Sequence, residues 1–358
     1  FHTQQHRSEN ISRQINSRTK KIEIQPVSLH EKISRKLNTK FLKYFEKTSF
    51  YPWFYRSKWH TLISKAETEH LNQNAYLTAR PNPGAGIGHQ MANWIAGHHI
   101  ARIFGLHYAH SPFPDPRWES FLGFGRNCIT ADELYTDRNY KRVRLPRFDL
   151  SNDKENTEIK SIISSYGSKT CFLCEQDQWF RALHEEKEIL QKKFYSAPSR
   201  KDHSLLFNKE RTSIAAHIRR GDICQKDNKS NPNLTMRWLD NEYFIQILDT
   251  VTEQLRDKRK YEIFLFSQGK EIDFKEFKKF DNFQLCNEMS AIDSFNHMTH
   301  ADILITSRSS FSYKPALLNR GIKICPPGFW HTYPDTPDWI EVQSYSAFQE
   351  KISHTFLI

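Results

Sequence analysis

The chain has 358 residues, of which 38% are hydrophobic and 26% charged, and its formal net charge is +11. This length allows two globular domains with separate cores, and no run of about 18 consecutive apolar residues is present, which argues against a membrane-spanning helix. The basic excess favours anionic partners such as nucleotide phosphates, nucleic acid or an anionic membrane surface.

Much of the positive charge lies in residues 1–45, which read as a basic tail or stem with a short amphipathic helix around Ser28–Phe45. Because the sequence starts at Phe1 and not at Met, a membrane tether upstream of residue 1 is compatible with it. We expect a Golgi lumenal location if such an anchor has been removed and a cytoplasmic one otherwise, so the compartment stays open.

The first predicted strand, Ala75–Thr78, runs into a glycine-rich loop that contains Gly86 and Gly88. Apolar residues then recur at helical spacing until Gly105, a suitable helix end. A strand, a glycine loop and a helix N-terminus together suit anion binding, because the backbone N–H groups are accessible there. A dinucleotide fingerprint is rejected, since Met91 stands where the third glycine is needed, and a simple tight turn remains the alternative.

Fewer elements are predicted in the next hundred residues. Leu106–Ala109 and Thr170–Leu173 read as strands and Glu185–Phe194 as a helix, whereas Asp149–Glu158 is polar and charged. Ala197–His203, with its Pro and Ser residues, is the best candidate for the crossing between two domains.

Strands and helices alternate regularly from Thr212 onward. The predicted strands are Thr212–Ile218, Tyr261–Phe266, Phe283–Leu285, Asp302–Thr306 and, as the last one, Ile322–Cys325, with helices over Glu242–Lys258, after a Ser290 cap, and up to Asn319. This alternation predicts a mostly parallel, doubly wound sheet. We therefore divide the chain into a tail (1–45), an acceptor-side domain (46–200), a nucleotide-binding domain (201–345) and a C-terminal extension (346–358).

Six cysteines are too few for a fold of this size held by disulfides. Cys171 and Cys174 have C-x-x-C spacing, but no second pair or histidine cluster follows at zinc-finger spacing. Buried thiols and a local disulfide both remain open for this pair.

Polar residues follow three of the predicted strands. Arg219 and Arg220 come after the strand at Thr212–Ile218, Ser267 after the next strand, and Ser309 and Ser310 after the strand that ends at Thr306. Ligands of open parallel sheets bind outside the carboxyl ends of the strands, and arginine can hold two phosphate oxygens at once. These positions therefore predict a diphosphate site, although a solvated ion-pair loop would explain the two arginines in isolation.

Three segments resemble one family of enzymes. His217–Asp222 is similar to the H-x-R-R-x-D motif of the fucosyltransferases that make α-1,2-, α-1,6- and protein O-linked fucose, and Ala291–Ser312 resembles their C-terminal donor-site segment. Gly86–Gln90 resembles the G-x-G-N-Q loop of their first domain, with His89 in place of the asparagine.

This resemblance implies an α/β GT-B-like fold, in which two Rossmann-like domains face a central cleft. It also implies GDP-fucose as donor substrate, inversion at the sugar carbon and no required cofactor or metal. Arg220 would hold the β-phosphate with support from Arg219, His217 and Asp293 would contact guanine, and Ser309 and Ser310 would bind the diphosphate. The remaining residues of the expected nucleotide site are Phe311, Ser267, Gly86 and Gly88.

The attacking hydroxyl needs a proton acceptor within hydrogen-bond reach, and two carboxylates follow the arginine pair. Resemblance to the α-1,6 branch ranks Asp227 first as this base and Asp222 second, or as an organiser of the loop. Acceptors contact variable loops, here expected at Pro112–Arg126 and His331–Trp339. The sequence does not specify which sugar or protein these loops receive.

We therefore expect an inverting glycosyltransferase that moves fucose from GDP-fucose to a hydroxyl of a glycan or glycoconjugate, without a nucleic-acid partner. A GT-B glycosyltransferase that uses another nucleotide sugar is the nearest alternative. A non-catalytic protein that binds nucleic acid or carbohydrate is a more distant alternative, because the strand-end serines have no role in it. Linkage and oligomeric state stay open.

Overall fold

The computed structural model describes residues 74–82, 84–164, 166–174, 180–224, 232–256 and 259–355. Three sequence-based expectations lie outside these residues: the basic tail, the helix around Ser28–Phe45, and the position of Asp227. Among the described residues, no helix combines the length and the apolar character needed to cross a membrane.

The first domain is built on a parallel sheet with strand order β2-β1-β4-β3. Its strands are β1 (Tyr76–Ala79), β2 (His107–Tyr108), β3 (Lys141–Arg144) and β4 (Thr170–Cys174). Its helices are α4 (Ile87–Ile103), α5 (Pro116–Leu122), α6 (Ala131–Thr136) and α7 (Asp153–Ser164), followed by the 3-10 turn η1 (Leu183–Glu186), α8 (Lys187–Tyr195) and η2 (Pro198–Asp202). The predicted strands and the predicted helix of this region are thus confirmed.

Helix α4 is buried along almost its whole length. On one side Gly97 lies so close to β1 that an added Cβ would overlap the Cβ of Ala79. Elsewhere Met91, Trp94 and Ile95 join a core cluster that also contains residues of the second domain, including Tyr313. An apolar helix of this kind is stable only where it is covered on every side, and α4 is covered by both domains.

The second domain contains a six-stranded parallel sheet with strand order β10-β9-β8-β5-β6-β7. Its strands are β5 (Thr212–His217), β6 (Tyr261–Phe266), β7 (Phe283–Leu285), β8 (Ile303–Ile305), β9 (Ile322–Cys325) and β10 (Trp339–Glu341). Its helices are α9 (Pro232–Thr235), α10 (Asn241–Arg256), α11 (Ala291–His300), α12 (Ser310–Leu318) and α13 (Tyr345–Thr355), with 3-10 turns η3 (Gly221–Cys224) and η5 (Glu271–Lys279).

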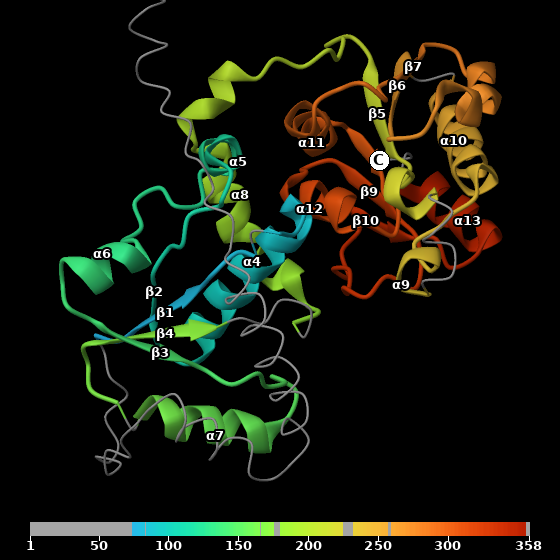
Figure 1. Cartoon of the computed structure of the whole chain (residues 1–358). Coiled ribbons are helices and arrows are strands. Elements are labelled where there is room, and N and C mark those ends of the chain that lie inside the picture. The colour runs from blue at the N-terminus through green and yellow to red at the C-terminus, as the bar shows by residue number, and fades with distance from the viewer. Residues whose placement is uncertain are drawn as a thin grey trace, which may run out of the picture. The chain divides into compact units, whose positions relative to one another are not determined.

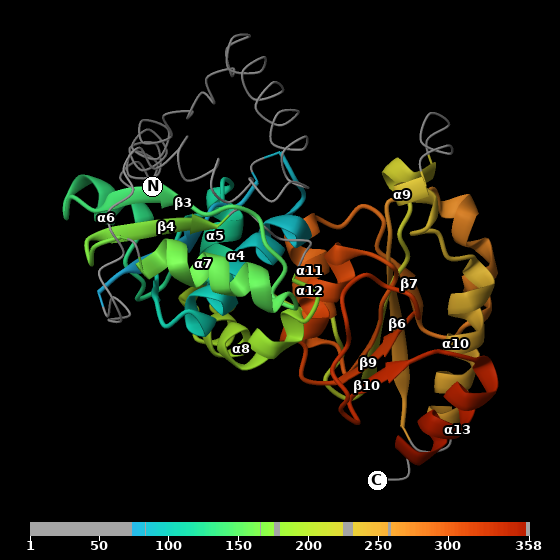
Figure 2. The same ribbon diagram turned by 90° about the horizontal axis from the view of Figure 1, so that it is seen from below.

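Alternating residues of the central strand β5 face opposite sides of this sheet, as strand geometry requires. Ala215 packs in the core on the side of α11 and α12, whereas Ile214 and Ala216 pack in the core on the side of α10 and α13. Figures 1 and 2 show these two pairs of helices on the two faces of the sheet. The α/β fold with two doubly wound parallel domains, expected for a GT-B architecture, is confirmed.

The strand order reverses between β5 and β8. The chain proceeds from β5 through β6 to β7 in one direction, and from β8 through β9 to β10 in the other. At such a switch point the connections leave in opposite directions and open a crevice at the carboxyl ends of the two strands. The arginine pair follows β5 and the serine pair follows β8, so both loops border the same crevice.

Ile322–Cys325 is not the last strand, and this sequence-based prediction was wrong. Trp339–Glu341 forms β10 at the sheet edge and pairs in parallel with β9. The following residues form α13, whose Phe348 and Ile352 are buried with the residues of α10, so Tyr345–Thr355 belongs to the second domain and is not a separate extension. A three-residue strand that follows two prolines carries too little periodicity to be found from sequence.

Helices α5, α6 and α7 and strand β3 of the first domain were not predicted from the sequence. The charged stretch at Asp149–Glu158 leads into α7, which buries Ile159, Ile162 and Ile163. Strand β3 has the sequence Lys-Arg-Val-Arg, and only Val143 is buried. The open question on the C-x-x-C pair is answered in favour of free thiols, because Cys171 and Cys174 are both buried and unbridged.

Candidate active site

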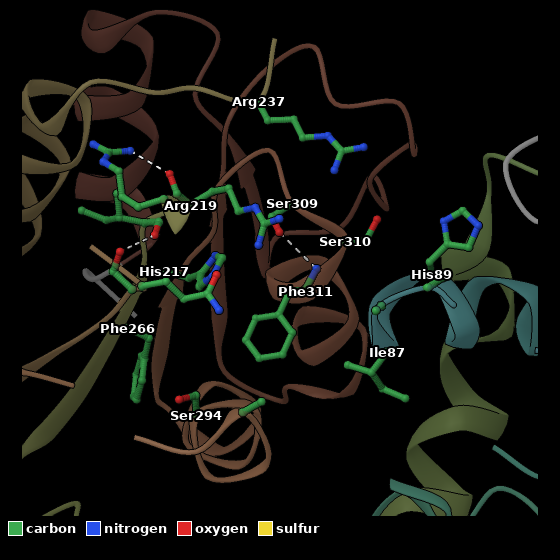
Figure 3. A pocket seen from close by; sticks show the side chains of 18 of the residues that line it. Ile87, His89, His217, Arg219, Arg237, Phe266, Ser294, Ser309, Ser310 and Phe311 are labelled. Carbon is green, nitrogen blue, oxygen red and sulfur yellow. Dashed lines mark hydrogen bonds between the residues drawn. The ribbon is translucent and has the colours of Figure 1, made fainter. Parts of the chain in front are cut away.

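A cavity of about 910 Å³ lies between the two domains, at the carboxyl ends of β5, β6 and β8 (Figure 3). The first domain contributes residues 85–89, Ala92, Trp118 and Arg181. The second domain contributes residues 217–220, Met236, Arg237, residues 266–268, Asn287, Met289, Ala291, Ser294, residues 309–311, Trp330 and His331. This volume falls in the range of sites that enclose a ligand of nucleotide-sugar size.

The N-terminus of α4 forms the first-domain wall of the cavity. The N-cap residue is Gly86, which has no side chain to cap the helix. Both Gly86 and Gly88 line the cavity. A Cβ on Gly88 would lie 2.7 Å from the carbonyl carbon and oxygen of Ser310, a distance that real Cβ contacts do not reach. The glycine at position 88 therefore lets α4 approach the backbone of α12.

The N-terminus of α12 faces α4 across this contact. Ser309 is the N-cap, and its Oγ accepts a hydrogen bond from the Phe311 N–H at 3.2 Å. Ser310 lines the cavity beside it. Two helix N-termini, one from each domain, thus meet at one place, and the positive ends of their dipoles favour a bound anion there.

The two arginines after β5 have different surroundings. Arg220 is 4% exposed, and its guanidinium donates to the Leu239 carbonyl at 3.1 Å and to Asn241 Oδ1 at 2.7 Å, while stacking on Trp238 at 3.9 Å. The side chain of Arg219 extends toward Ser309 in Figure 3. Both residues line the cavity, but the Arg220 guanidinium is bonded to the loop that follows, whereas the Arg219 side chain extends into the cavity toward Ser309 (Figure 3).

Gly221 turns the chain directly after the two arginines. It has φ of +73°, in the left-handed region that favours glycine, and an added Cβ would lie 2.5 Å from Gln268 Oε1. The chain turns sharply there into η3, which contains Asp222. The role of Asp222 stays a prediction, as does that of Asp227.

His217 is a neutral imidazole at the floor of the cavity. Burial lowers its pKa to about 3, and the charges of Arg219 and Arg220 act in the same direction. Its Nδ1 lies 2.8 Å from the hydroxyl of Ser307, and its ring packs on Phe311. An imidazole held neutral in this way can contribute a hydrogen bond but no charge.

Two other predicted site residues have structural partners. Ser267 lines the cavity, but its hydroxyl donates to the Ile218 carbonyl at 2.8 Å and so ties the ends of β5 and β6 together. Asp293 is not among the described residues that line the cavity; its carboxylate accepts from the Ser290 hydroxyl at 2.6 Å and lies 3.7 Å from His203. Ala291 and Ser294, on the same turn of α11, line the cavity in its place.

His331, the first residue of one expected acceptor loop, is 2% exposed and stacks on Tyr313, and burial lowers its pKa to about 2, with Lys314 as the second cause. Other lining residues were not singled out from the sequence. Arg237 follows the polar stretch after the arginine loop and lies over the ring of Trp330. No periodicity marks these residues, because they lie in turns whose position depends on contacts between distant segments.

The loops expected to receive an acceptor do reach the cavity, through Trp118 of the first loop and His331 of the second. Arg308 links two segments near the cavity: its guanidinium donates to the Pro327 carbonyl at 3.0 Å and to the Met236 carbonyl at 3.3 Å. Among the described lining residues there are arginines and histidines but no Asp or Glu. The cavity is therefore suited to a polyanionic ligand.

The chain is similar to known glycosyltransferases. A family model described as glycosyl transferase family 11 matches residues 157–335. A search of curated proteins found no match. Solved structures that resemble the chain include POFUT1 in complex with GDP (12% identity, TM-score 0.40, covering 72% of this chain and 99% of that one). They also include NodZ alpha-1,6-fucosyltransferase soaked with GDP-fucose (11% identity, TM-score 0.39, covering 68% and 92%).

Proposed function

Because the chain belongs to glycosyl transferase family 11 and is a glycosyltransferase, we propose that it transfers fucose from GDP-fucose to a hydroxyl of a glycan or glycoconjugate. Transfer proceeds with inversion at the sugar carbon and without a required metal ion. Family membership confirms the resemblance to fucosyltransferases and speaks against the non-catalytic alternatives. Nucleotide binding tests whether the donor is GDP-fucose or another nucleotide sugar.

One observation supports the proposal most strongly: Arg219 extends toward Ser309 at the N-terminus of α12 (Figure 3), and this helix end meets the N-terminus of α4. As the bond between the sugar carbon and the diphosphate breaks, its electron pair moves to the diphosphate oxygens. Donors that are already in place stabilise this growing charge without reorganising, and one such donor typically contributes about 10²–10³ in rate. Arg219 thus takes the phosphate role that the sequence suggested for Arg220.

The guanine base has a place at the β6 and α11 side of the cavity. Phe266 and Phe311 offer aromatic faces there, and Asn287 and Ser294 offer hydrogen-bonding groups for the edge of a purine. His217 lies between this part and the arginine loop (Figure 3). In this assignment Asp293 organises the first turn of α11 and does not touch the base.

The fucose ring and the acceptor occupy the opposite end, next to α4 and Trp118. The attacking hydroxyl forms a new bond to the sugar carbon on the face opposite to the leaving diphosphate, which inverts the configuration. Its proton must pass to a nearby acceptor. Asp227, with Asp222 as second choice, is the candidate that the sequence offers for this step.

Thermal unfolding in the presence of GDP, UDP or CMP tests the donor assignment. A ligand that binds only the folded protein at 100 times its dissociation constant stabilises it by about 2.7 kcal/mol. We expect GDP to raise the melting temperature and UDP and CMP to have little effect. Stabilisation by UDP but not by GDP would remove the GDP-fucose assignment and leave another nucleotide sugar as donor.

The Arg219→Ala variant is the matched control for this panel. It should retain the melting temperature of the unliganded protein and lose most of the rise caused by GDP. An equal rise in the variant and the wild type would show that the nucleotide binds elsewhere.

A further inference from the structure

His89 is held at the first-domain wall of the cavity by the close contact between the two domains. Gly88 packs directly on the backbone of Ser310, and His89 is the next residue of α4. Figure 3 shows its ring across the cavity from Ser309 and Ser310. It is partly exposed, lines the cavity, and stands where the resembling loop of the fucosyltransferases has asparagine.

We propose that His89 is a catalytic residue that accepts the proton of the attacking acceptor hydroxyl. The proposal rests on the function proposed above. In this step the hydroxyl oxygen bonds to the sugar carbon, the bond from that carbon to the diphosphate breaks, and its electron pair leaves with GDP. The hydroxyl proton passes to a neutral ring nitrogen of His89, so charge and atoms balance.

The other described groups that line the cavity are unsuited to this task. Arginine stays protonated in proteins and cannot accept a proton. Burial lowers the pKa of His217 to about 3 and of His331 to about 2, so neither takes up a proton readily near neutral pH. Asp and Glu are absent from the described part of the lining. His89, in contrast to these two histidines, is partly exposed and accessible from the cavity.

The charges around His89 match the direction of proton transfer. Lys314 from α12 and His89 both act electrostatically on His331, and Arg181, Arg219 and Arg237 line the same cavity. When the diphosphate becomes more negative on leaving, its new charge and the proton taken up by His89 stabilise each other across the cavity.

The test compares His89→Asn, His89→Gln and His89→Ala with the wild type. We expect His89→Asn to keep its GDP-induced rise in melting temperature and its KM for GDP-fucose, and to lose about 10²–10⁴ in kcat. The fall of kcat/KM toward acid pH in the wild type should be absent from the Asn and Gln variants. Added imidazole should restore part of the activity of His89→Ala, because it can supply the missing proton acceptor.

Asp227→Asn is the rival variant in the same series. If it removed the acid-side fall of kcat/KM while His89→Asn kept both this fall and the wild-type rate, the assignment of His89 would be overturned and Asp227 would be the base. GDP stabilisation of the wild type together with wild-type rates in His89→Asn would overturn only this assignment. Absence of GDP stabilisation in the wild type would instead overturn the proposed function, and this assignment with it.

Discussion

Adjacent, chemically identical residues can take different roles when their side chains have different partners. Arg219 and Arg220 are indistinguishable in sequence, and both were correctly expected at the end of a strand. The Arg220 guanidinium is oriented by Leu239 and Asn241, which lie about twenty residues further along the chain and accept its hydrogen bonds. Sequence therefore predicts the pair but cannot decide which member faces the ligand.

Alanine substitutions of Arg219 and Arg220 should affect different properties, namely catalysis and stability. Arg219→Ala should leave the free energy of unfolding nearly unchanged and lower kcat by about 10²–10³, because a donor to the leaving group is lost. Arg220→Ala should lower the free energy of unfolding by about 2–4 kcal/mol, since hydrogen bonds from a buried charged donor are removed. Urea denaturation and steady-state kinetics on both proteins check this. A normal kcat for Arg219→Ala with a strong loss for a fully stable Arg220→Ala would return the phosphate role to Arg220.

At the scale of elements, the site depends on how closely α4 and α12 approach each other. The sequence predicted both helix starts, because a glycine loop precedes one and a serine pair precedes the other. It did not predict that these two helix ends touch, since no local pattern encodes contact between residues more than two hundred positions apart. The same limit explains why α13 was missed, because it packs on α10 about a hundred residues earlier in the chain.

Gly88→Ala tests this contact, and Gly86→Ala is its control. An alanine Cβ at position 88 would meet the Ser310 carbonyl at 2.7 Å, whereas nothing lies within 4 Å of a Cβ at position 86. We expect Gly88→Ala to weaken GDP binding strongly because α4 must move away from the serine pair. Gly86→Ala, whose added Cβ meets no neighbour, should lose much less affinity for GDP, as measured by calorimetric titration. Equal affinities of the two variants would contradict the close approach.

A second link holds α4 to the segment before α8. The Glu186 carboxylate is 3% exposed and accepts hydrogen bonds from His98 Nδ1 at 2.6 Å, His99 Nδ1 at 2.9 Å and Arg102 Nη2 at 3.0 Å. Burial alone would raise the pKa of this carboxyl, but the bonds from the two histidines and Arg102 outweigh burial and lower it to about 2. The carboxylate thus helps hold the helix that carries the glycine loop.

This link gives the protein a specific pH dependence. In the folded protein the pKa of the Glu186 carboxyl lies below its ordinary value of 4.5. The stabilisation that this carboxylate provides is therefore fully present above pH of about 4.5 and is lost as the pH falls toward 2. Lowering a pKa by one unit corresponds to about 1.4 kcal/mol. The Glu186→Gln substitution should therefore lower the free energy of unfolding by about 3 kcal/mol at neutral pH, and by progressively less below pH of about 4.5. Chemical denaturation at several pH values measures this difference. The neighbouring, half-exposed Glu185 provides the control: a Glu185→Gln loss as large as that of Glu186→Gln would contradict the account.

At the scale of the whole molecule, the cavity results from the order of strands in the second sheet. The sequence showed which strands end in polar residues, and the resemblance to fucosyltransferases indicated two facing domains. It could not show that β5 and β8 are neighbours, with His217 bonded to Ser307 ninety positions away. Strand order is decided by the packing of helices on both faces, which depends on the complete chain. Arg237 and Trp330 became site residues only through this arrangement.

The central claim is that this cavity transfers fucose from GDP-fucose, with Arg219 stabilising the departing diphosphate. The most direct measurement is the rate of fucosylated product formation from GDP-fucose over a panel of glycan acceptors, with UDP-sugars as competing donors and Arg219→Ala beside the wild type. We predict product from GDP-fucose alone and a rate about 10²–10³ lower for the variant. Product from a UDP-sugar but not from GDP-fucose, or an unchanged rate for Arg219→Ala, would contradict the account.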